Sequence, residues 1–287
     1  MKKSFKTTLA LTGVLIALVL WYVIYEKGIK VKRNEAQENA KLVVSIPREE
    51  IQEFEVDRLK NLEALLAAKE KATAEYETFK FKRIDKSWLI TSPLNDEADV
   101  STIAAVLSTL TTTKNEREIA QNPEDLSAYG LDFPRYKIRV RRNSGEDFSE
   151  VLIGKDTPVG YSSYLIPAGQ KGAVYRVARS LRTSFDKKLS DYRNKNLFSL
   201  TRPDVDEVEL RNSYGSFILA RTDTDSWTLA RENIPASSDE VKKMLGAVLD
   251  LRAKEFVSEK ATQLGSYGLS KPAVEALVKK KNTKQPE

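Results

Sequence analysis

The longest apolar run of the chain lies near its start. Residues 8–25 carry no charged side chain and end in aromatic residues. At about 1.5 Å per residue, a helix of this length spans roughly 27 Å, enough for a thin or locally adjusted bilayer. Aromatic residues at one end are typical of a belt at headgroup level. The pattern predicts a transmembrane signal-anchor, and the residues that we expect to hold it in the membrane are Leu9, Leu15, Leu18, Trp21, Tyr22 and Tyr25.

The sequence after this run favours an uncleaved anchor over a cleaved signal peptide. The apolar core is long, and the next residues, Glu26–Lys30, contain no Ala-x-Ala cleavage pattern. Lysines and arginines flank the run on both sides, so charge alone does not orient it. A tail as short as residues 1–7 stays inside easily, and long domains cross the membrane largely regardless of charge. We therefore expect a single-pass protein of the bacterial inner membrane with its C-terminal domain in the periplasm, joined by a juxtamembrane linker over residues 26–42.

The polar remainder of the chain repeats one pattern of hydrophobic positions. Alternating strands flank an Asp/Ser turn before Trp88 and again before Trp227, which predicts a hairpin in each place. Each hairpin is followed by an acidic or hydroxyl-rich segment that can cap a helix, and then by a helix with one apolar face. Both copies end in the same tripeptide, in which glycine favours a left-handed C-cap. The tripeptides are Tyr129, Gly130 and Leu131 in the first copy and Tyr267, Gly268 and Leu269 in the second.

The repeat predicts an α+β protein with two tandem homologous units behind the transmembrane helix. The first unit covers residues 43–134 and the second residues 201–278, with a β-rich connector over residues 135–200. The first unit is longer because residues 57–75 insert between its opening strands. A basic tail over residues 279–287 completes the chain.

Two segments are candidate contacts for a partner. The insert is rich in strong helix formers, and its leucines recur on one helical face. A helix packed on its own domain is the alternative explanation. After the first Tyr-Gly-Leu copy, cations alternate with apolar residues, so that period two places the cations on one face of a strand. That row can dock an acidic partner or anionic headgroups, or it can be a solvated outer face or a protected edge that contributes little to stability. The candidate residues are Leu59, Leu62 and Leu66 of the insert and Arg135, Lys137, Arg139 and Arg141 of the strand.

Composition excludes several kinds of chemistry. The 287 residues include no histidine and no cysteine, so imidazole bases, thiolate nucleophiles and their metal sites are impossible. The net charge of +6 is modest, and much of the basic excess lies near the two ends. This distribution favours an anionic membrane surface over nucleic acid. We expect no cofactor, no metal and no catalytic residue.

Two further functions stay open beside a binding role. Ser184 and Lys187 match the Ser-x-x-Lys spacing of penicillin-interacting enzymes, which makes a hydrolase of cell-envelope material the main rival. The Lys-Thr-Gly partner motif of those enzymes is absent from the sequence. A glycan- or lipid-binding domain that uses aromatic residues is the third possibility.

Several short motifs resemble one protein family when they are taken together. They are a tryptophan followed by proline five residues later, a Tyr-Gly-Leu-Asp-x-Pro turn, and the runs at 41–47, 153–160 and 191–198. Over roughly residues 40–275 the chain resembles the bacterial family called domain of unknown function 4340. The resemblance implies an exported, membrane-anchored protein, often encoded beside ABC transporter permeases and gliding-motility-type auxiliary proteins. It implies no catalytic residues.

These patterns together predict a non-enzymatic interaction module at the periplasmic face of the inner membrane. Its partners are expected to be membrane lipid, through the anchor, and an ABC-type permease or auxiliary subunit. The mechanism would be binding and positioning, because an anchor raises the local concentration of whatever it carries.

Overall fold

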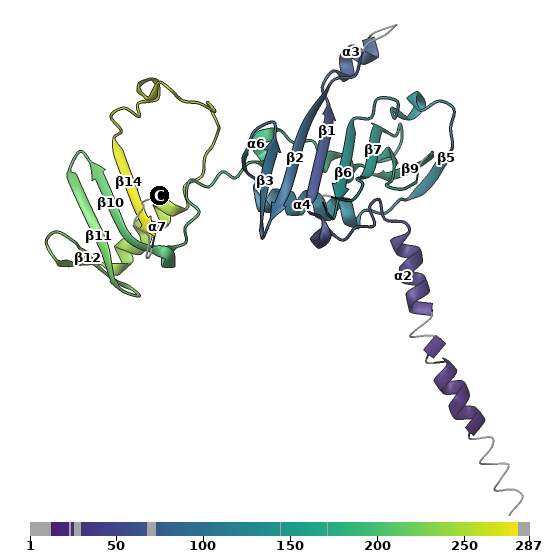
Figure 1. Ribbon diagram of the computed structural model, residues 1–287, viewed down its shortest axis with the longest axis horizontal. Helices are drawn as coiled ribbons and strands as arrows, with labels where there is room; N and C mark the ends of the chain where they lie inside the picture. The colour runs from purple at the N-terminus through teal and green to yellow at the C-terminus, as the bar shows by residue number, and fades with distance from the viewer. Residues whose placement is uncertain are drawn as a thin grey trace, which may run out of the picture. The chain divides into compact units, whose positions relative to one another are not determined.

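The molecule contains two compact α+β units, Met1–Arg193 and Asn194–Glu287. The structure, a computed structural model, describes residues 13–22, 24–25, 30–67, 73–143, 145–170 and 172–280. One unit holds a nine-stranded sheet and the other a five-stranded sheet. The α+β class expected from the sequence is therefore confirmed (Figure 1).

The predicted anchor is described only in part. Leu9 lies outside the described residues, whereas residues 13–22 are helical and their apolar side chains are exposed. Trp21 stacks on Tyr25 with ring centroids 5.5 Å apart. Within the described ranges, no helix is both long enough and apolar enough to cross a membrane.

The predicted linker contains a helix. Helix α2 (Val31–Asn39) is built mostly from polar and charged residues and buries none of its side chains. Near its C-terminal end, Glu38 lies 2.6 Å from the ammonium group of Lys114 and 2.7 Å from that of Lys41. These ion pairs link the end of α2 to the segment that follows α4 (Val100–Thr112).

Every neighbouring pair of strands in the larger sheet is antiparallel. In spatial order the strands are β4 (Asp96–Glu97), β3 (Ser87–Ser92), β2 (Tyr76–Ile84), β1 (Glu53–Leu59), β6 (Tyr136–Arg141), β7 (Ser149–Asp156), β8 (Ser162–Ile166), β9 (Ala173–Ala178) and β5 (Arg117–Gln121). The shorter helical elements of this unit are η2 (Arg48–Glu50), α3 (Leu62–Ala67), η3 (Ser127–Tyr129), α5 (Arg179–Ser184) and α6 (Leu189–Tyr192).

Helix α4 covers one face of this sheet, and the core lies between them (Figure 1). The helix begins at Val100 because the Asp99 side chain accepts a hydrogen bond from the Thr102 backbone N–H at 2.7 Å. Its apolar stripe is buried from Ile103 to Leu110, as are the inward-facing phenylalanines Phe54, Phe79 and Phe81 of the sheet. Period two along the strands leaves the charged side chains on the opposite, open face.

The sheet of the smaller unit has the same strand order as five adjacent strands of the larger sheet, from β4 to β6. Its order is β13 (Ile234–Ala236), β12 (Ser226–Leu229), β11 (Gly215–Asp223), β10 (Val205–Asn212) and β14 (Val274–Lys280). Helix α7 (Ser238–Leu249) packs on the sheet, and η4 (Arg202–Asp204) and η5 (Leu264–Tyr267) are its short helical turns. The series β4-β3-β2-β1-β6 and the series β13-β12-β11-β10-β14 therefore follow the same connections.

Equivalent tryptophans lie at equivalent places in the two sheets. Trp88 pairs across the hairpin with Arg83, and Trp227 pairs with Arg221. Both tryptophans are buried, each in the core of its own unit. The Arg221 guanidinium lies 4.6 Å from the centre of the Trp227 ring.

The predicted connector is wrong as a separate region. Residues 135–200 supply β6 to β9, which are hydrogen-bonded into the same sheet as β1, and the first compact unit extends to Arg193. The basic tail also begins too early in the prediction, because Lys279 and Lys280 belong to β14. Sequence periodicity identified these strands but carried no information about which strands are neighbours.

The predicted insert is also shorter than expected. Leu59 lies at the end of β1, where it pairs with Tyr76, so residues 57–59 are strand and not helix. Helix α3 covers only Leu62–Ala67, and residues 68–72 lie outside the described residues. Cross-strand pairing has overridden the helix propensity of this segment at Leu59.

Candidate functional site

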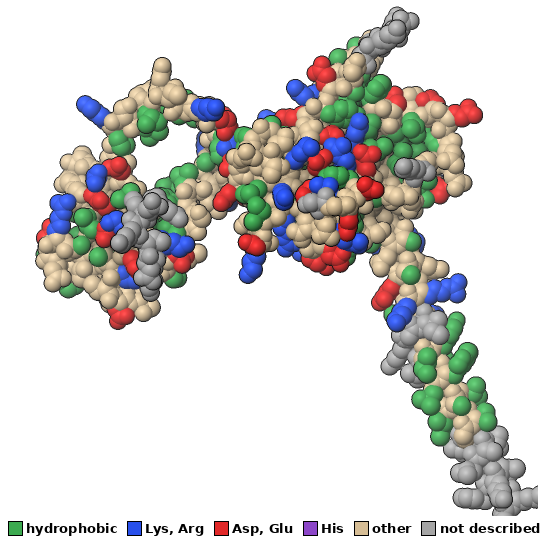
Figure 2. Space-filling view, viewed as in Figure 1, with side chains coloured by type: hydrophobic (Ala, Val, Ile, Leu, Met, Phe, Trp, Pro, Cys, Tyr) green, Lys and Arg blue, Asp and Glu red, His purple; other side chains and the backbone are tan. Residues whose placement is uncertain are grey.

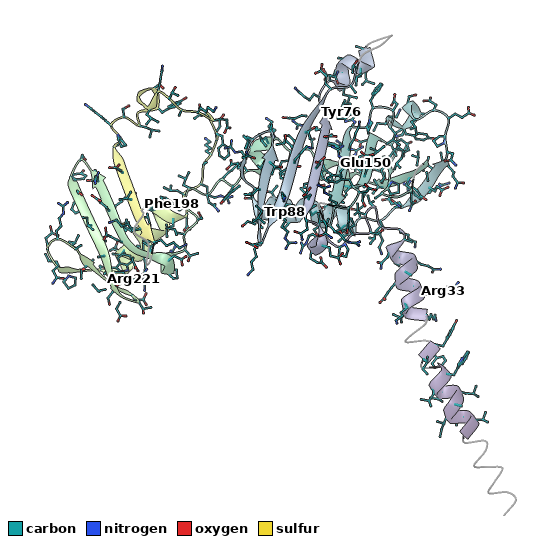
Figure 3. The ribbon with its side chains drawn as sticks, in the orientation of Figure 1. Arg33, Tyr76, Trp88, Glu150, Phe198 and Arg221 are labelled. Carbon is teal, nitrogen blue, oxygen red and sulfur yellow. The ribbon has the colours of Figure 1, made fainter. Side chains whose placement is uncertain are left out.

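A polar pocket of about 390 Å³ lies where the ends of β1 and β6 approach α3 and α5. It brings together three of the residues expected to contact a partner, namely Leu59, Leu62 and Arg135. The other residues that line it are Arg58, Lys60, Glu77, Tyr136, Arg182 and Asp186. Figure 3 shows Tyr76 at the adjoining end of β2. Four cations and two carboxylates surround the pocket, so its walls carry an excess of positive charge.

Internal contacts already use most of these charges. The Arg58 guanidinium lies 2.6 Å from a Glu77 carboxylate oxygen and donates a second hydrogen bond to the Lys187 carbonyl at 3.0 Å. Arg182 donates to Asp156 at 2.8 Å. The Tyr136 hydroxyl donates to Asp186 at 3.4 Å.

Arg135 differs from its neighbours in this pocket. Within the described ranges its guanidinium has no hydrogen-bond or ion-pair partner, and its Nε atom is buried. A guanidinium without a carboxylate partner is suited to bind a carboxylate or phosphate group. The pocket can therefore hold an anion, and Leu59 and Leu62 give it an apolar wall beside that cation.

Two buried tyrosines lie near this charge. Burial and the Asp186 carboxylate raise the pKa of Tyr136 to about 12. Tyr192 is fully buried against Phe79 and Phe81, and its hydroxyl has no hydrogen-bond partner among the described residues. Burial and then Tyr136 raise the pKa of Tyr192, while Arg58 opposes them. Neither phenol ionises near neutral pH, so neither is a general base. The sequence signalled Tyr192 only through its family motif, and no role was expected for it.

The predicted row of cations is real, but it is not a free basic surface. β6 lies between β1 and β7 in the interior of the sheet, and its arginines face the acidic residues of β1. Arg139 Nη2 lies 2.8 Å from Glu55 and 3.0 Å from Asp57, and Arg141 pairs with Glu53. Figure 2 shows the resulting mixture of blue and red side chains over these strands.

The remaining members of the row are engaged differently. The Lys137 ammonium group lies 4.3 Å from the centre of the Tyr76 ring, and Arg139 is opposite Glu150 of β7 in register (Figure 3). Of the alternatives to a docking surface, the protected edge is excluded, because β6 has a partner strand on each side. Leu66 is highly exposed on α3 and lies apart from the pocket lining.

Ser184 and Lys187 do not form a nucleophile and base pair in this structure. The Ser184 hydroxyl donates a hydrogen bond to the Leu181 carbonyl at 2.7 Å, as helical serines commonly do. Within the residues described here, no hydrogen bond joins its Oγ atom to Lys187. The described chain also holds no group of three or more acidic residues placed to bind a metal ion.

The second Tyr-Gly-Leu copy differs from the first in how far its side chains are exposed. In the first unit, Leu131 is 3% exposed and the Tyr129 ring packs edge-on against Tyr164 at 5.1 Å. In the second unit the equivalent side chains are open to solvent, and Figure 2 shows apolar groups exposed on the loop before β14. We call the set Leu264, Tyr267, Leu269 and Val274 the motif patch.

Comparison with protein families matches residues 88–233 to the family described as Domain of unknown function (DUF4340). The match begins at Trp88 on β3 and ends between β12 and β13, so it joins part of each unit and covers just over half of the 287 residues. It confirms the resemblance seen in the sequence motifs. No curated protein and no solved structure matches the chain.

Proposed function

The chain belongs to the DUF4340 family, and from that premise we propose that it is a non-enzymatic interaction module. It is held to the bacterial inner membrane by one N-terminal helix, with its two α+β units in the periplasm. There it serves as an accessory subunit of an ABC-transporter-type complex or another envelope complex. It works by binding and positioning a partner and has no active site of its own.

The motif patch is the observation that carries this proposal. Four apolar side chains are between 47% and 62% exposed in the second unit, whereas three of the four equivalent side chains pack in the first. Large apolar side chains that are exposed close together in the chain can mark a binding surface. The polar pocket supports the same view, because Arg58 and Glu77 are ion-paired with each other and the described residues that line it include no serine, threonine or cysteine.

Substitution within the patch tests this function. We expect Leu269→Glu to abolish co-purification of the membrane partner from native membranes while the fold and thermal melting of the chain stay unchanged. Ile234→Glu is the matched control, since Ile234 is 52% exposed on β13 at the other edge of the same sheet. Equal loss in both variants, or no loss in either, would remove the support that the patch gives.

The anchor and the location are proposed from residues 8–25, whose uncharged apolar composition suits a bilayer. A reporter that is active only in the periplasm, fused after residue 287, should be active. Activity of a reporter that works only in the cytoplasm would reverse the orientation.

An anionic lipid headgroup is a second candidate ligand, favoured by Arg135 alone. Its unpaired guanidinium lies beside the apolar wall of the pocket, and a headgroup with its first methylenes offers the complementary groups. Arg135→Gln should weaken binding to phosphatidylglycerol vesicles, whereas Lys86→Gln in the exposed β2–β3 turn should not. Equal binding by both variants would exclude this ligand from the pocket.

The rival hydrolase is tested through Ser184. We expect Ser184→Ala to leave function intact, because its hydroxyl serves the helix carbonyl of Leu181. Loss of function in this variant, with folding and partner binding preserved, would replace the binding role with the enzymatic one.

A further inference from the structure

The two Tyr-Gly-Leu copies fold into the same turn. The Leu131 N–H donates to the Leu126 carbonyl at 3.1 Å, and the Leu269 N–H donates to the Leu264 carbonyl at 2.9 Å. Both glycines are left-handed, with φ of 64° at Gly130 and 71° at Gly268. The difference between the units therefore lies in what covers the turn and not in the turn itself.

In the first unit, the hairpin β7–β8 covers it. Gly154 of β7 lies against the backbone of Tyr129 so closely that a Cβ atom there would overlap the Tyr129 carbonyl oxygen and crowd Leu131. Tyr164 of β8 packs against the Tyr129 ring. β7 also pairs with β6, so the same hairpin completes the sheet and buries the turn.

In the second unit, the equivalent strand has a partner on one side only. β14 pairs with β10, and no other strand among the described residues pairs with it. Val274 at its start is 62% exposed, whereas Tyr136 at the equivalent place in β6 is 4% exposed. The second unit thus has an open strand edge and an exposed apolar turn at the positions that one hairpin covers in the first unit.

We propose that a partner polypeptide adds a β-hairpin to the free edge of β14, as β7–β8 adds to β6. This rests on the proposed binding function and names its mode, β-strand addition. The added strand runs antiparallel to β14, and the motif patch packs against the hairpin. Main-chain hydrogen bonds to β14 supply the pairing, and the patch supplies the apolar burial.

The register of the two sheets defines the inward side of the added strand. Val140 pairs with Phe54, and Val278 pairs with Val208, which makes Val278 the equivalent of Val140. Counting back four residues makes Val274 the equivalent of Tyr136, which lies opposite Ile153. The partner strand therefore needs a branched apolar residue opposite Val274 and, directly after it, glycine beneath the Tyr267 carbonyl.

Charge complementarity defines its outward side. Glu275 takes the place of Lys137, which lies opposite Leu152, and Leu277 takes the place of Arg139, which lies opposite Glu150. The partner should therefore carry a cation opposite Glu275 and an apolar residue opposite Leu277. β7 of this chain has the required inward residues, Ile153 and Gly154. Its outward residues, Leu152 and Glu150, do not match Glu275 and Leu277.

A second folded copy does not offer the required hairpin. In every copy β7 is bonded to β6 and β8, and β8 to β7 and β9, so both strands already have two partners. A second copy could offer only an edge strand, and pairing of β14 with another β14 is the specific alternative that the experiment must detect.

The full-length chain in lipid nanodiscs can be tested with three synthetic hairpins of residues 148–166. One has the sequence of this chain, one carries Glu150→Leu with Leu152→Lys to match Glu275 and Leu277, and one adds Gly154→Val to the matched hairpin. Hydrogen exchange of residues 274–280 is the readout. We expect the matched hairpin to protect β14 and to bind about two- to five-fold more tightly than the unaltered hairpin, and the Gly154→Val hairpin not to bind.

The same experiment shows whether a hairpin binds the first unit instead, by displacing β7–β8 from β6. There the order of affinity should reverse, because Arg139 would no longer lie opposite a carboxylate and the ammonium group introduced by Leu152→Lys would face Lys137. Protection of β6 in place of β14, the reversed order, or equal binding of the Gly154→Val hairpin would overturn the proposal.

Two further results distinguish β-strand addition at β14 from the proposed binding function as a whole. The sequence has no cysteine, so Leu277→Cys reports β14–β14 pairing as a disulfide-linked dimer. Such a dimer, with β14 protected before any peptide is added, would overturn the hairpin in favour of a second copy. If no hairpin protects β14 while Leu269→Glu still loses its membrane partner, the binding function stands and strand addition is wrong.

Discussion

Asp156 at the end of β7 is bonded to Arg182 on α5, with Nε of the arginine 2.8 Å from Oδ1 of the carboxylate. The same carboxylate accepts from the Ser163 hydroxyl at 2.7 Å and lies 3.2 Å from Arg179. One side chain therefore holds β7, β8 and α5 together at the end of the sheet nearest the polar pocket.

This carboxylate should make stability depend on pH. Burial alone raises the pKa of Asp156, but the Ser163 hydroxyl and Arg182 outweigh it and hold the pKa below its ordinary 3.8. A lowered pKa means that the contribution is complete above pH 3.8 and is lost as the pH falls through the folded-state value.

Asp156→Asn measures that contribution. The variant should unfold about 1–3 kcal/mol more easily at pH 7, because Arg182 loses its ionic partner. Urea denaturation of both proteins at pH 7 and pH 3 should show a gap that narrows at the lower pH. A gap of equal size at both values would contradict the assigned pKa shift.

Gly154 should not tolerate a side chain. Gly154→Ala places a methyl group against the Tyr129 carbonyl and Leu131, and we expect a loss of about 1–3 kcal/mol. Gly145→Ala is the matched control, since no atom lies within 4 Å of a Cβ built there. Thermal melts that rank the two variants alike would show that the strand can move away from the turn.

The two tryptophans should each stabilise their own unit. Trp88→Ala and Trp227→Ala remove large buried side chains, and each should cost about 3–5 kcal/mol. Hydrogen exchange resolved by residue should show faster opening of β1 to β3 in the first variant and of β10 to β12 in the second. Normal protection in either variant would argue that its indole is a binding group and not a core residue.

Arg139 should matter more for stability than the other cations of its row. Asp57 is 8% exposed and depends on Arg139 and the Thr78 hydroxyl for its partners. Arg139→Ser leaves that carboxylate buried with one partner fewer, at a cost of about 1–3 kcal/mol. Lys137→Ser should change the denaturation midpoint little, and equal effects of the two changes would show that the ion pairs are replaceable by water.

The sequence predicted the local elements better than their arrangement. Apolar periodicity and turn residues located the hairpins at Trp88 and Trp227, the two helices and the glycine caps, because those signals depend only on residues near in the chain. The alternation around Arg139 correctly predicted which side of β6 is buried. The strand order was not predictable in the same way, since pairing of β6 with β1 depends on residues far apart in sequence.

The candidate site shows the same limit. Leu59, Leu62 and Arg135 were recognised separately, but their convergence on one pocket follows from the pairing of β1 with β6. Arg58, Glu77 and Asp186 were missed because isolated charged residues are common on any surface. The exposure of Tyr267 could not be predicted from its motif, because the same motif occurs at Tyr129. The two copies differ only in whether other strands cover them.

The central place of β6 has a consequence for how the larger sheet assembles during synthesis. Glu53 and Arg141 lie side by side in the finished sheet but are 88 residues apart in the chain. One edge of β1 therefore has no partner strand until the intervening residues have been synthesised. Contacts between residues so far apart in sequence also form slowly. During that interval, we expect the acidic residues of β1 to repel those of neighbouring nascent chains and so to keep the open edge from aggregating until the arginines of β6 are made.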